Sequence, residues 1–180
     1  MNQDIGRAIV FSMPVVSAAV SLILISLDTT RSSNTVDRKI HYNMIAVYCL
    51  MILFWSGLVM HSIARDTFIA YLPVFFSSFA FIPVFLYRIT HIITDTGERK
   101  RFPPCLFILP ACLTLIICAI ALAVPLWQRW AAIYDNEVNL TSAIIDITFI
   151  VCILLCILYS WLSLLRIKSV SYTHLTLPTT

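Results

Sequence analysis

The sequence predicts an all-α protein, a polytopic membrane helix bundle of five transmembrane helices with its N-terminus outside and the end of its fifth helix in the cytoplasm. Of its 180 residues, 60% are hydrophobic and only 12% are charged, whereas about one-quarter of the residues in soluble domains are charged. The mean hydropathy is +0.92. The apolar residues also stand in long runs, not at the periodic spacing of a soluble core. A lipid bilayer is therefore the predicted environment.

Five apolar runs are long enough to cross that bilayer. A hydrocarbon layer about 30 Å thick needs on the order of 20 helical residues. Because lipid offers the backbone no hydrogen-bond partner, runs of this length cross it as helices. The five helices are predicted at approximately 8–27, 44–64, 68–93, 104–127 and 143–165.

The first helix is short enough to be a secretory signal peptide, but its flanking charges argue against that. The basic residues of a signal peptide precede its apolar run. Here the acid Asp4 and the base Arg7 precede the run, and the other nearby basic residues follow it: Arg31, Arg38 and Lys39. We interpret the run as an uncleaved transmembrane helix.

The third helix is longer than a bilayer requires. Its last turns are predicted to extend into the cytoplasm, so that Arg88 reaches the headgroups and needs no special partner, while His91 lies on a solvated face. The segment TDTGERKRFPP then ends the helix. Gly97 can adopt a left-handed cap, and the two prolines at 103–104 forbid continuation.

The prolines and the small residues indicate how the helices bend and pack. Pro14, Pro73, Pro83 and Pro110 fall inside predicted helices, where each removes a backbone hydrogen bond and permits a kink. On the fifth helix, residues at helical spacing form a small and polar stripe that is predicted to pack against a neighbour. The stripe consists of Thr148, Cys152, Cys156, Tyr159 and Ser163.

The placement of Lys and Arg predicts the orientation, because cytoplasmic loops are enriched in both. With the N-terminus outside, three basic residues face outward: Arg7, Arg65 and Arg129. The other nine face the cytoplasm: Arg31, Arg38, Lys39, Arg88, Arg99, Lys100, Arg101, Arg166 and Lys168. The opposite orientation would invert this ratio.

The last residues are predicted to be foreign to the protein. The segment 170–180, VSYTHLTLPTT, is polar and carries no helical period or turn signal. It resembles the translation of a transposase adapter used to prepare sequencing libraries. We therefore expect one transmembrane domain over 1–168, an artefactual tail over 169–180, and a natural chain that continues into the cytoplasm.

Polar residues near the predicted outer surface form the candidate ligand site. Asp146 lies about one turn into the fifth helix, where the helix N-terminus favours negative charge. The others flank the second, third and fourth helices. The candidate periplasmic pocket consists of His61, Arg65, Asp66, Arg129, Tyr134 and Asp146. The alternative is that each lies singly at headgroup level.

The sequence contains no motif for catalysis, a metal or a cofactor. Cys152 and Cys156 have a spacing that two metal ligands can use, but no His or carboxylate joins them. Phosphate-binding loops, paired-His zinc motifs and nucleophile elbows are absent. We expect a protein that is not an enzyme and whose partners are the lipid bilayer and neighbouring helices, including those of a second copy.

The stretch FIPVFLYRITHIITDTGERKRFPPCLFILPA, residues 81–111, resembles the N-terminal membrane half of bacterial membrane-anchored AraC-type transcription regulators. In that family a proline-containing helix is also followed by a short basic cytoplasmic loop. The resemblance implies a location in the bacterial cytoplasmic membrane and a sensor or anchor role, with two further helices and a DNA-binding module beyond this chain. The chain itself lacks that module, so it is not expected to bind nucleic acid.

Two other hypotheses remain open. In the first hypothesis, the chain is the membrane half of a sensor histidine kinase. In the second, it is a fragment of a transporter or permease. A transporter predicts further helices, inverted repeats and polar residues near the bilayer midplane. The central thirds of the five runs hold few polar residues, which favours the signalling hypotheses.

Overall fold

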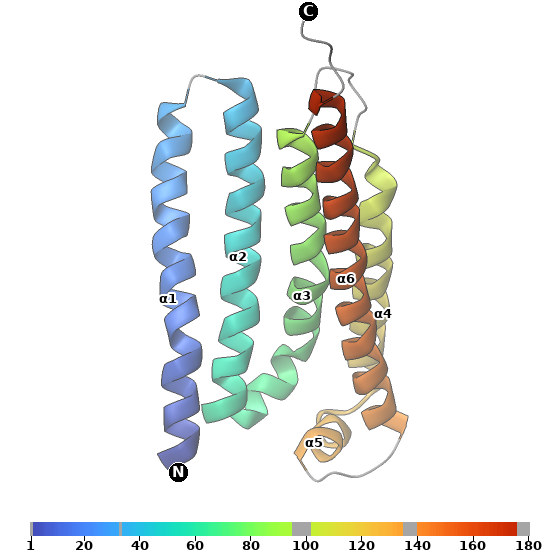
Figure 1. The fold of residues 1–180 in the computed structure, drawn as a ribbon. Coiled ribbons are helices and arrows are strands. Elements are labelled where there is room, and N and C mark those ends of the chain that lie inside the picture. Colours follow the sequence, from blue (N-terminus) through green and yellow to red (C-terminus); the bar gives the residue numbers. More distant parts are fainter. Residues whose placement is uncertain (1, 33, 95–101, 135–139, 176–180) are drawn as a thin grey trace, which may run out of the picture.

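The computed structural model describes residues 2–32, 34–94, 102–134 and 140–175, with side chains over 4–32, 34–94, 102–134 and 140–168. Apart from short connections, this part of the chain is helical (Figure 1). Its elements in order are α1 (Asn2–Arg31), α2 (Thr35–Ile63), α3 (Arg65–Ile93), the 3-10 turn η1 (Pro104–Phe107), α4 (Ile108–Ala123), α5 (Leu126–Tyr134) and α6 (Leu140–Leu175). The all-α prediction is confirmed.

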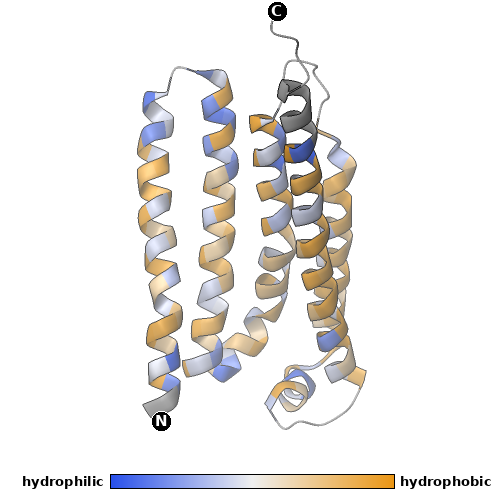
Figure 2. Cartoon of the chain, viewed as in Figure 1, coloured by the Kyte–Doolittle hydropathy of each residue, from blue (hydrophilic) through white to orange (hydrophobic). Residues whose placement is uncertain are grey.

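The described elements form five spans that are long and apolar enough to cross a membrane, as predicted: α1, α2, α3, η1 together with α4, and α6. They support a multi-pass membrane protein. Figure 2 shows hydrophobic residues along the middle of the long helices and hydrophilic residues mainly near their ends. Large apolar side chains face outward, among them Leu122, which is 90% exposed. In a bilayer such residues contact lipid, so they carry no penalty.

The fourth predicted helix is wrong at its end. It was expected over 104–127, but α4 stops at Ala123 and a separate helix, α5, begins at Leu126. Val124 between them is extended, with φ of −96° and ψ of 121°. The cause is Pro125, which cannot donate a backbone hydrogen bond and pushes the preceding residue out of the helical region.

The remaining boundaries are wider than the apolar runs. Polar residues continue α1 and α2 beyond the hydrophobic stretch, because a helix needs no apolar side chains once it leaves the bilayer. Helix α6 continues to Leu175, so its backbone includes the first part of the segment assigned to the adapter. Gly97 and the basic residues at 99–101 lie outside the described residues.

Helix α3 is the centre of the bundle. Helix α1 packs against α2, α2 packs against α3, and α3 also contacts both α4 and α6. The N-terminus, the α2–α3 turn and α5 lie at one end, here called the α5 end (Figure 1). The α1–α2 turn, the end of α3 and the end of α6 lie at the other, here called the far end.

Aromatic side chains fill the space around α3. Phe75 stacks on Phe54 of α2 with 4.8 Å between ring centroids. On the other side, the stripe predicted on α6 packs inward: Thr148, Cys152 and Tyr159 are buried, and the Cys152 thiol lies 3.9 Å from the Phe76 carbonyl of α3. The prediction that this stripe packs against a neighbouring helix is confirmed for these three residues, whereas Cys156 and Ser163 are half-buried.

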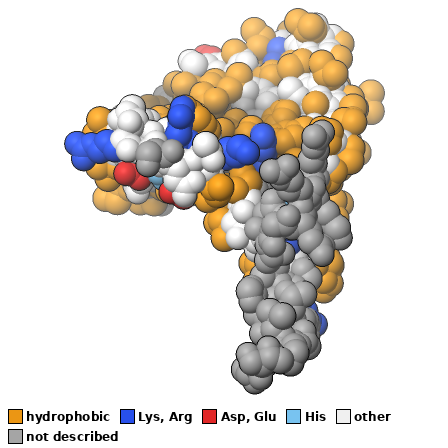
Figure 3. Space-filling model, turned by 90° about the horizontal axis from the view of Figure 1, so that it is seen from above, with side chains coloured by type: hydrophobic (Ala, Val, Ile, Leu, Met, Phe, Trp, Pro, Cys, Tyr) orange, Lys and Arg blue, Asp and Glu red, His pale blue; other side chains and the backbone are white. Residues whose placement is uncertain are grey.

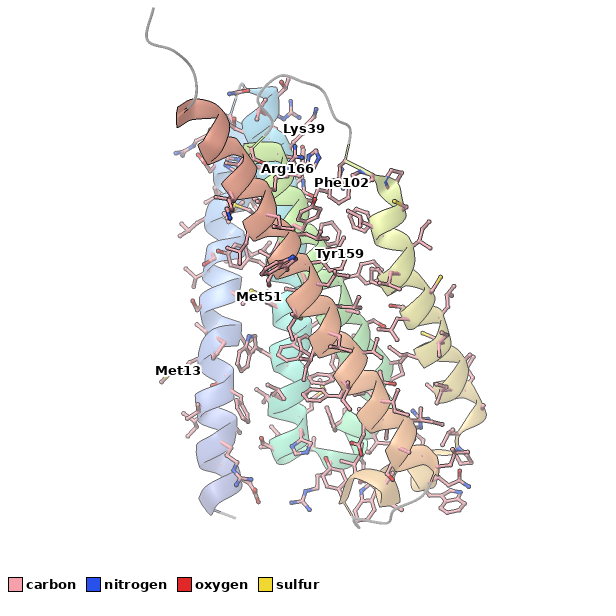
Figure 4. The ribbon with its side chains drawn as sticks, turned by 45° about the vertical axis from the view of Figure 1, so that its right-hand side comes forward. Met13, Lys39, Met51, Phe102, Tyr159 and Arg166 are labelled. Carbon is pink, nitrogen blue, oxygen red and sulfur yellow. The ribbon has the colours of Figure 1, made fainter. Side chains whose placement is uncertain are left out.

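Tyr159 also supplies a hydrogen bond that α4 lacks. Its hydroxyl donates to the Leu106 carbonyl over 2.6 Å. Leu106 stands four residues before Pro110, which has no N–H to offer that carbonyl. Figure 4 shows the Tyr159 side chain on α6 in the upper half of the bundle. A side chain from α6 thus satisfies a backbone group that a proline leaves unpaired.

The far end gathers cations and aromatic rings. The Arg88 guanidinium lies 5.8 Å from the Phe102 ring and 5.7 Å from the Phe107 ring, within cation–π distance. His91 is buried with its ring 5.5 Å from that of Phe102. The prediction that His91 lies on a solvated face is wrong, because its side chain is buried. The sequence did not indicate the aromatic contacts of Arg88. Phe102, two residues before η1, lies against the end of α3 and contacts both residues.

Candidate functional site

The α5 end brings together several residues of the predicted pocket. The His61 ring at the end of α2 stacks on the Tyr134 ring of α5, with 5.5 Å between centroids. The Arg65 guanidinium, from the first turn of α3, lies 5.0 Å from the centre of the same Tyr134 ring. Tyr134 is therefore held between the ends of two long helices.

Two short connections create this arrangement. Helices α2 and α3 are joined by the single residue Ala64, whose φ of −138° and ψ of 68° reverse the chain. His61 and Arg65 are thereby placed on adjoining helix ends. At the other side, Pro125 ends the straight course of the fourth span, so that α5 lies across the end of the bundle (Figure 1).

Arg129 connects α5 to the middle helix. Its Nη1 atom donates to the Ile69 carbonyl of α3 over 3.3 Å. Ile69 stands four residues before Pro73, which has no N–H to donate to that carbonyl. The arrangement repeats the one at Leu106: a side chain from another helix satisfies a carbonyl that a proline leaves unpaired. Partial burial lowers the pKa of Arg129 from its usual value.

A small cavity lies beside this contact. Its volume is about 40 Å³, and Arg129 and Pro73 line it together with residues of α4 and α6. That is room for about one water molecule. The Nε atom of Arg129 is buried and has no hydrogen-bond partner in the part of the chain that the structure describes. The guanidinium is thus held by one bond and retains donor capacity near the kink.

Tyr134 is aromatic in its contacts but polar at its tip. Its hydroxyl is buried and has no hydrogen-bond partner among the described side chains and backbone. Burial raises the pKa of Tyr134, an effect that Asp66 reinforces and Arg65 opposes. The phenol therefore stays protonated at neutral pH and keeps a hydroxyl donor at the centre of the cluster.

Asp66 faces a different hollow from the one that holds Arg129. A depression of about 370 Å³ lies between the first turn of α3 and α5. Its lining consists of Asp66, Ile69, Leu126, Trp127 and Trp130. The two tryptophans were not assigned to a site from the sequence, because nothing in the linear pattern shows that α5 turns back over the start of α3.

Asp146 is not brought into the cluster. It lies on an exposed face of α6, whereas Ile145 and Thr148 of the same helix line the small cavity. Its position near the start of α6 agrees with the sequence, but its side chain has no described contact with the other five predicted residues. The structure thus divides the predicted pocket into a cluster around Tyr134, the Arg129 contact, the Asp66 depression and a separate Asp146.

The far end carries contacts that sequence analysis did not identify. The Nε atom of Arg166 on α6 donates to the Thr94 hydroxyl at the end of α3 over 3.0 Å. Figure 4 shows Arg166 at the same end of the bundle as Lys39 and Phe102. In Figure 3, which looks onto this end, Lys and Arg side chains gather over the helix ends. Helices α3 and α6 are thus joined where the described basic residues concentrate.

Within the described residues, no group of three or more His, Cys, Asp or Glu side chains is placed to hold a metal ion. A scan against protein-family models, a search of curated proteins and a search of solved structures each find no match to the chain.

Proposed function

We propose that the chain is the membrane-embedded sensor or anchor module of a bacterial signalling protein, with its α5 end outside the cytoplasmic membrane. The nine-to-three division of Lys and Arg supports this orientation. In it, the cluster around Tyr134 faces the periplasm and the joined ends of α3 and α6 face the cytoplasm. A signal at α5 then changes how these two helix ends lie relative to each other.

The Arg129 contact is the observation that carries this proposal. A short helix at one end of the bundle donates a hydrogen bond to the backbone of the central helix at its proline. Proline positions are where a helix bends most easily, because the local backbone ladder is interrupted. Movement of α5 therefore acts directly on the bend of α3.

The rest of the path to the far end runs through packed contacts. Helix α6 follows α3 through Cys152 and Tyr159, both essentially inaccessible to solvent. The path ends at the hydrogen bond between Arg166 and Thr94. Because close-packed elements transmit small displacements without absorbing them, a change in the α3 bend reaches this hydrogen bond.

The output at the far end is, by the resemblance, an AraC-type DNA-binding module. The histidine-kinase hypothesis differs by predicting a phospho-acceptor helix there, and the transporter hypothesis differs by predicting further apolar spans. The reading frame beyond the codon for Lys168 at the chromosomal locus distinguishes the three.

Replacement of Arg129 by methionine tests the proposed coupling. Nitroxide labels at Ile93→Cys on α3 and Ile167→Cys on α6, both exposed positions, report the distance between the two far ends. The four exposed cysteines are replaced by alanine: Cys49, Cys105, Cys112 and Cys118. With Arg129→Met the Ile69 carbonyl loses its donor, so we expect the distance distribution to shift or broaden.

The matched control is Arg7→Met, which removes an exposed arginine of α1 at the same end of the bundle. It should leave the distribution unchanged. A distribution in Arg129→Met that is identical to the wild-type distribution, in a variant that unfolds at the wild-type temperature, would contradict the proposal that α5 acts on the far end.

A further inference from the structure

We propose that Asp66, Trp127 and Trp130 form a binding site for an organic ammonium group. The biological role of this binding rests on the proposed function, because the ammonium group is the chemical class of ligand that the sensor module takes. The chemical basis for the inference is the depression between α3 and α5, which Arg129 does not line.

The shape and lining of the depression fit such a group. At about 370 Å³, it lies within the range of about 300 to 1,000 Å³ that small-molecule sites occupy. Two tryptophans line it beside one carboxylate, and Trp127 is 69% exposed. A cation over an indole face is attracted by the negative face of the ring, and tryptophan is the best residue for this contact. Methylated ammonium groups suit such sites because they are charged and also bury apolar surface.

The charge of Asp66 is available to a ligand. Its carboxylate forms no ion pair with any described residue. It lies in the first turn of α3, where the helix dipole stabilises a negative charge. The site therefore presents one anion against two aromatic rings.

The neighbouring cations are engaged elsewhere. Arg65 is adjacent in sequence, but consecutive helical residues do not face each other, and its guanidinium lies over the Tyr134 ring. Arg129 donates to the Ile69 carbonyl on the side of the small cavity. Through long-range repulsion, both arginines lower the affinity of the site for a cation. Neither arginine is among the residues that line the depression, so neither competes for the ligand position.

An ammonium group at this position has two sources. One is a phospholipid headgroup of the outer leaflet, such as that of phosphatidylethanolamine, because α5 lies across the bundle end with Leu126 and Trp127 exposed. The other is a free amine in the periplasm. Both present the same chemistry to Asp66 and the indole rings, so the experiment is arranged to separate them.

The test measures tryptophan fluorescence of the full chain in lipid nanodiscs. The protein has 4 tryptophans, and Trp55→Phe with Trp161→Phe leaves only the two at the site as reporters. Choline chloride is titrated against matched sodium chloride in nanodiscs of phosphatidylglycerol, whose headgroup carries no ammonium. We expect a saturable emission change and an affinity about tenfold weaker in Asp66→Asn. Trp127→Leu should weaken binding in the same direction.

Asp4→Asn is the matched control, because it removes the acid in the first turn of α1 at the same end of the bundle. It should bind choline as the wild type does. The titration is repeated in phosphatidylethanolamine nanodiscs. Loss of choline binding there identifies the lipid headgroup as the occupant, and retention identifies a free ammonium compound.

Two results would overturn the inference. One is the absence of a saturable choline response in phosphatidylglycerol together with identical emission in the two lipids. The other is equal choline affinity for Asp66→Asn and the wild type. The spin-label measurement uses no ammonium compound. It therefore tests the proposed function independently of the ligand class.

Discussion

Replacing Gly57 by alanine is expected to lower the free energy of unfolding by about 1–3 kcal/mol, the usual cost of overpacking a filled interior. Gly57 is buried on α2 where it meets α3. A Cβ atom there would lie 2.6 Å from Cδ2 of Phe75 and 3.3 Å from Cε1 of Tyr71. The Phe75 ring cannot move aside easily, because it stacks on Phe54 and contacts Phe76 edge to face.

The control for this substitution is Gly6→Ala on α1, where nothing lies within 4 Å of the added atom. It isolates the helix-propensity gain of alanine over glycine, about 1 kcal/mol. Unfolding by sodium dodecyl sulfate in mixed micelles, followed by circular dichroism, measures both variants. Equal stability changes for Gly57→Ala and Gly6→Ala would show that α2 and α3 do not pack as described.

Replacing Tyr159 by alanine is expected to cost about 3–5 kcal/mol, the range for truncating a buried aromatic side chain. Tyr159 is 1% exposed and lies between α3 and α4, with its ring 6.1 Å from that of Tyr87. The hydroxyl contributes separately. Tyr159→Phe leaves the Leu106 carbonyl without its donor and is expected to cost about 1 kcal/mol, as interhelical hydrogen bonds in membranes do.

A double-mutant cycle with Pro110→Ala isolates the role of that hydroxyl. Alanine at position 110 restores a backbone N–H that can donate to the Leu106 carbonyl, four residues earlier. Tyr159→Phe should therefore cost less in the Pro110→Ala background than in the wild type, by the same unfolding measurement. An equal cost in both backgrounds would mean that Tyr159 does not substitute for the donor that proline lacks.

The helices are predictable because the bilayer leaves the backbone so little choice. In lipid, the backbone N–H and C=O groups of a run such as 44–64 must form hydrogen bonds with one another. The length of the run is then sufficient to predict a helix. The stripe on α6 follows in the same way from the 3.6-residue period. The prediction failed at the end of the fourth span, where the run stays apolar through Trp127 although Pro125 already ends the helix. Hydropathy is insensitive to such a break.

The candidate site was predictable only as a set of residues at one end of the bundle. The meeting of His61 and Arg65 with Tyr134 depends on α5 turning across the bundle, and no local pattern encodes that turn. Asp146 lies near the same end of the bundle, but its side chain is exposed on α6. The sequence shows that Pro73 removes a donor, but it cannot show which side chain replaces it, since Arg129 lies far along the chain.

The orientation of the bundle decides whether the candidate site faces a periplasmic signal. Alkaline phosphatase fused after Thr94, at the far end, and after Tyr134, at the α5 end, measures it directly, because this enzyme is active only outside the cytoplasm. The account predicts activity for the fusion after Tyr134 and none for the fusion after Thr94. Activity in the reverse order, at comparable levels of expressed protein, would contradict it.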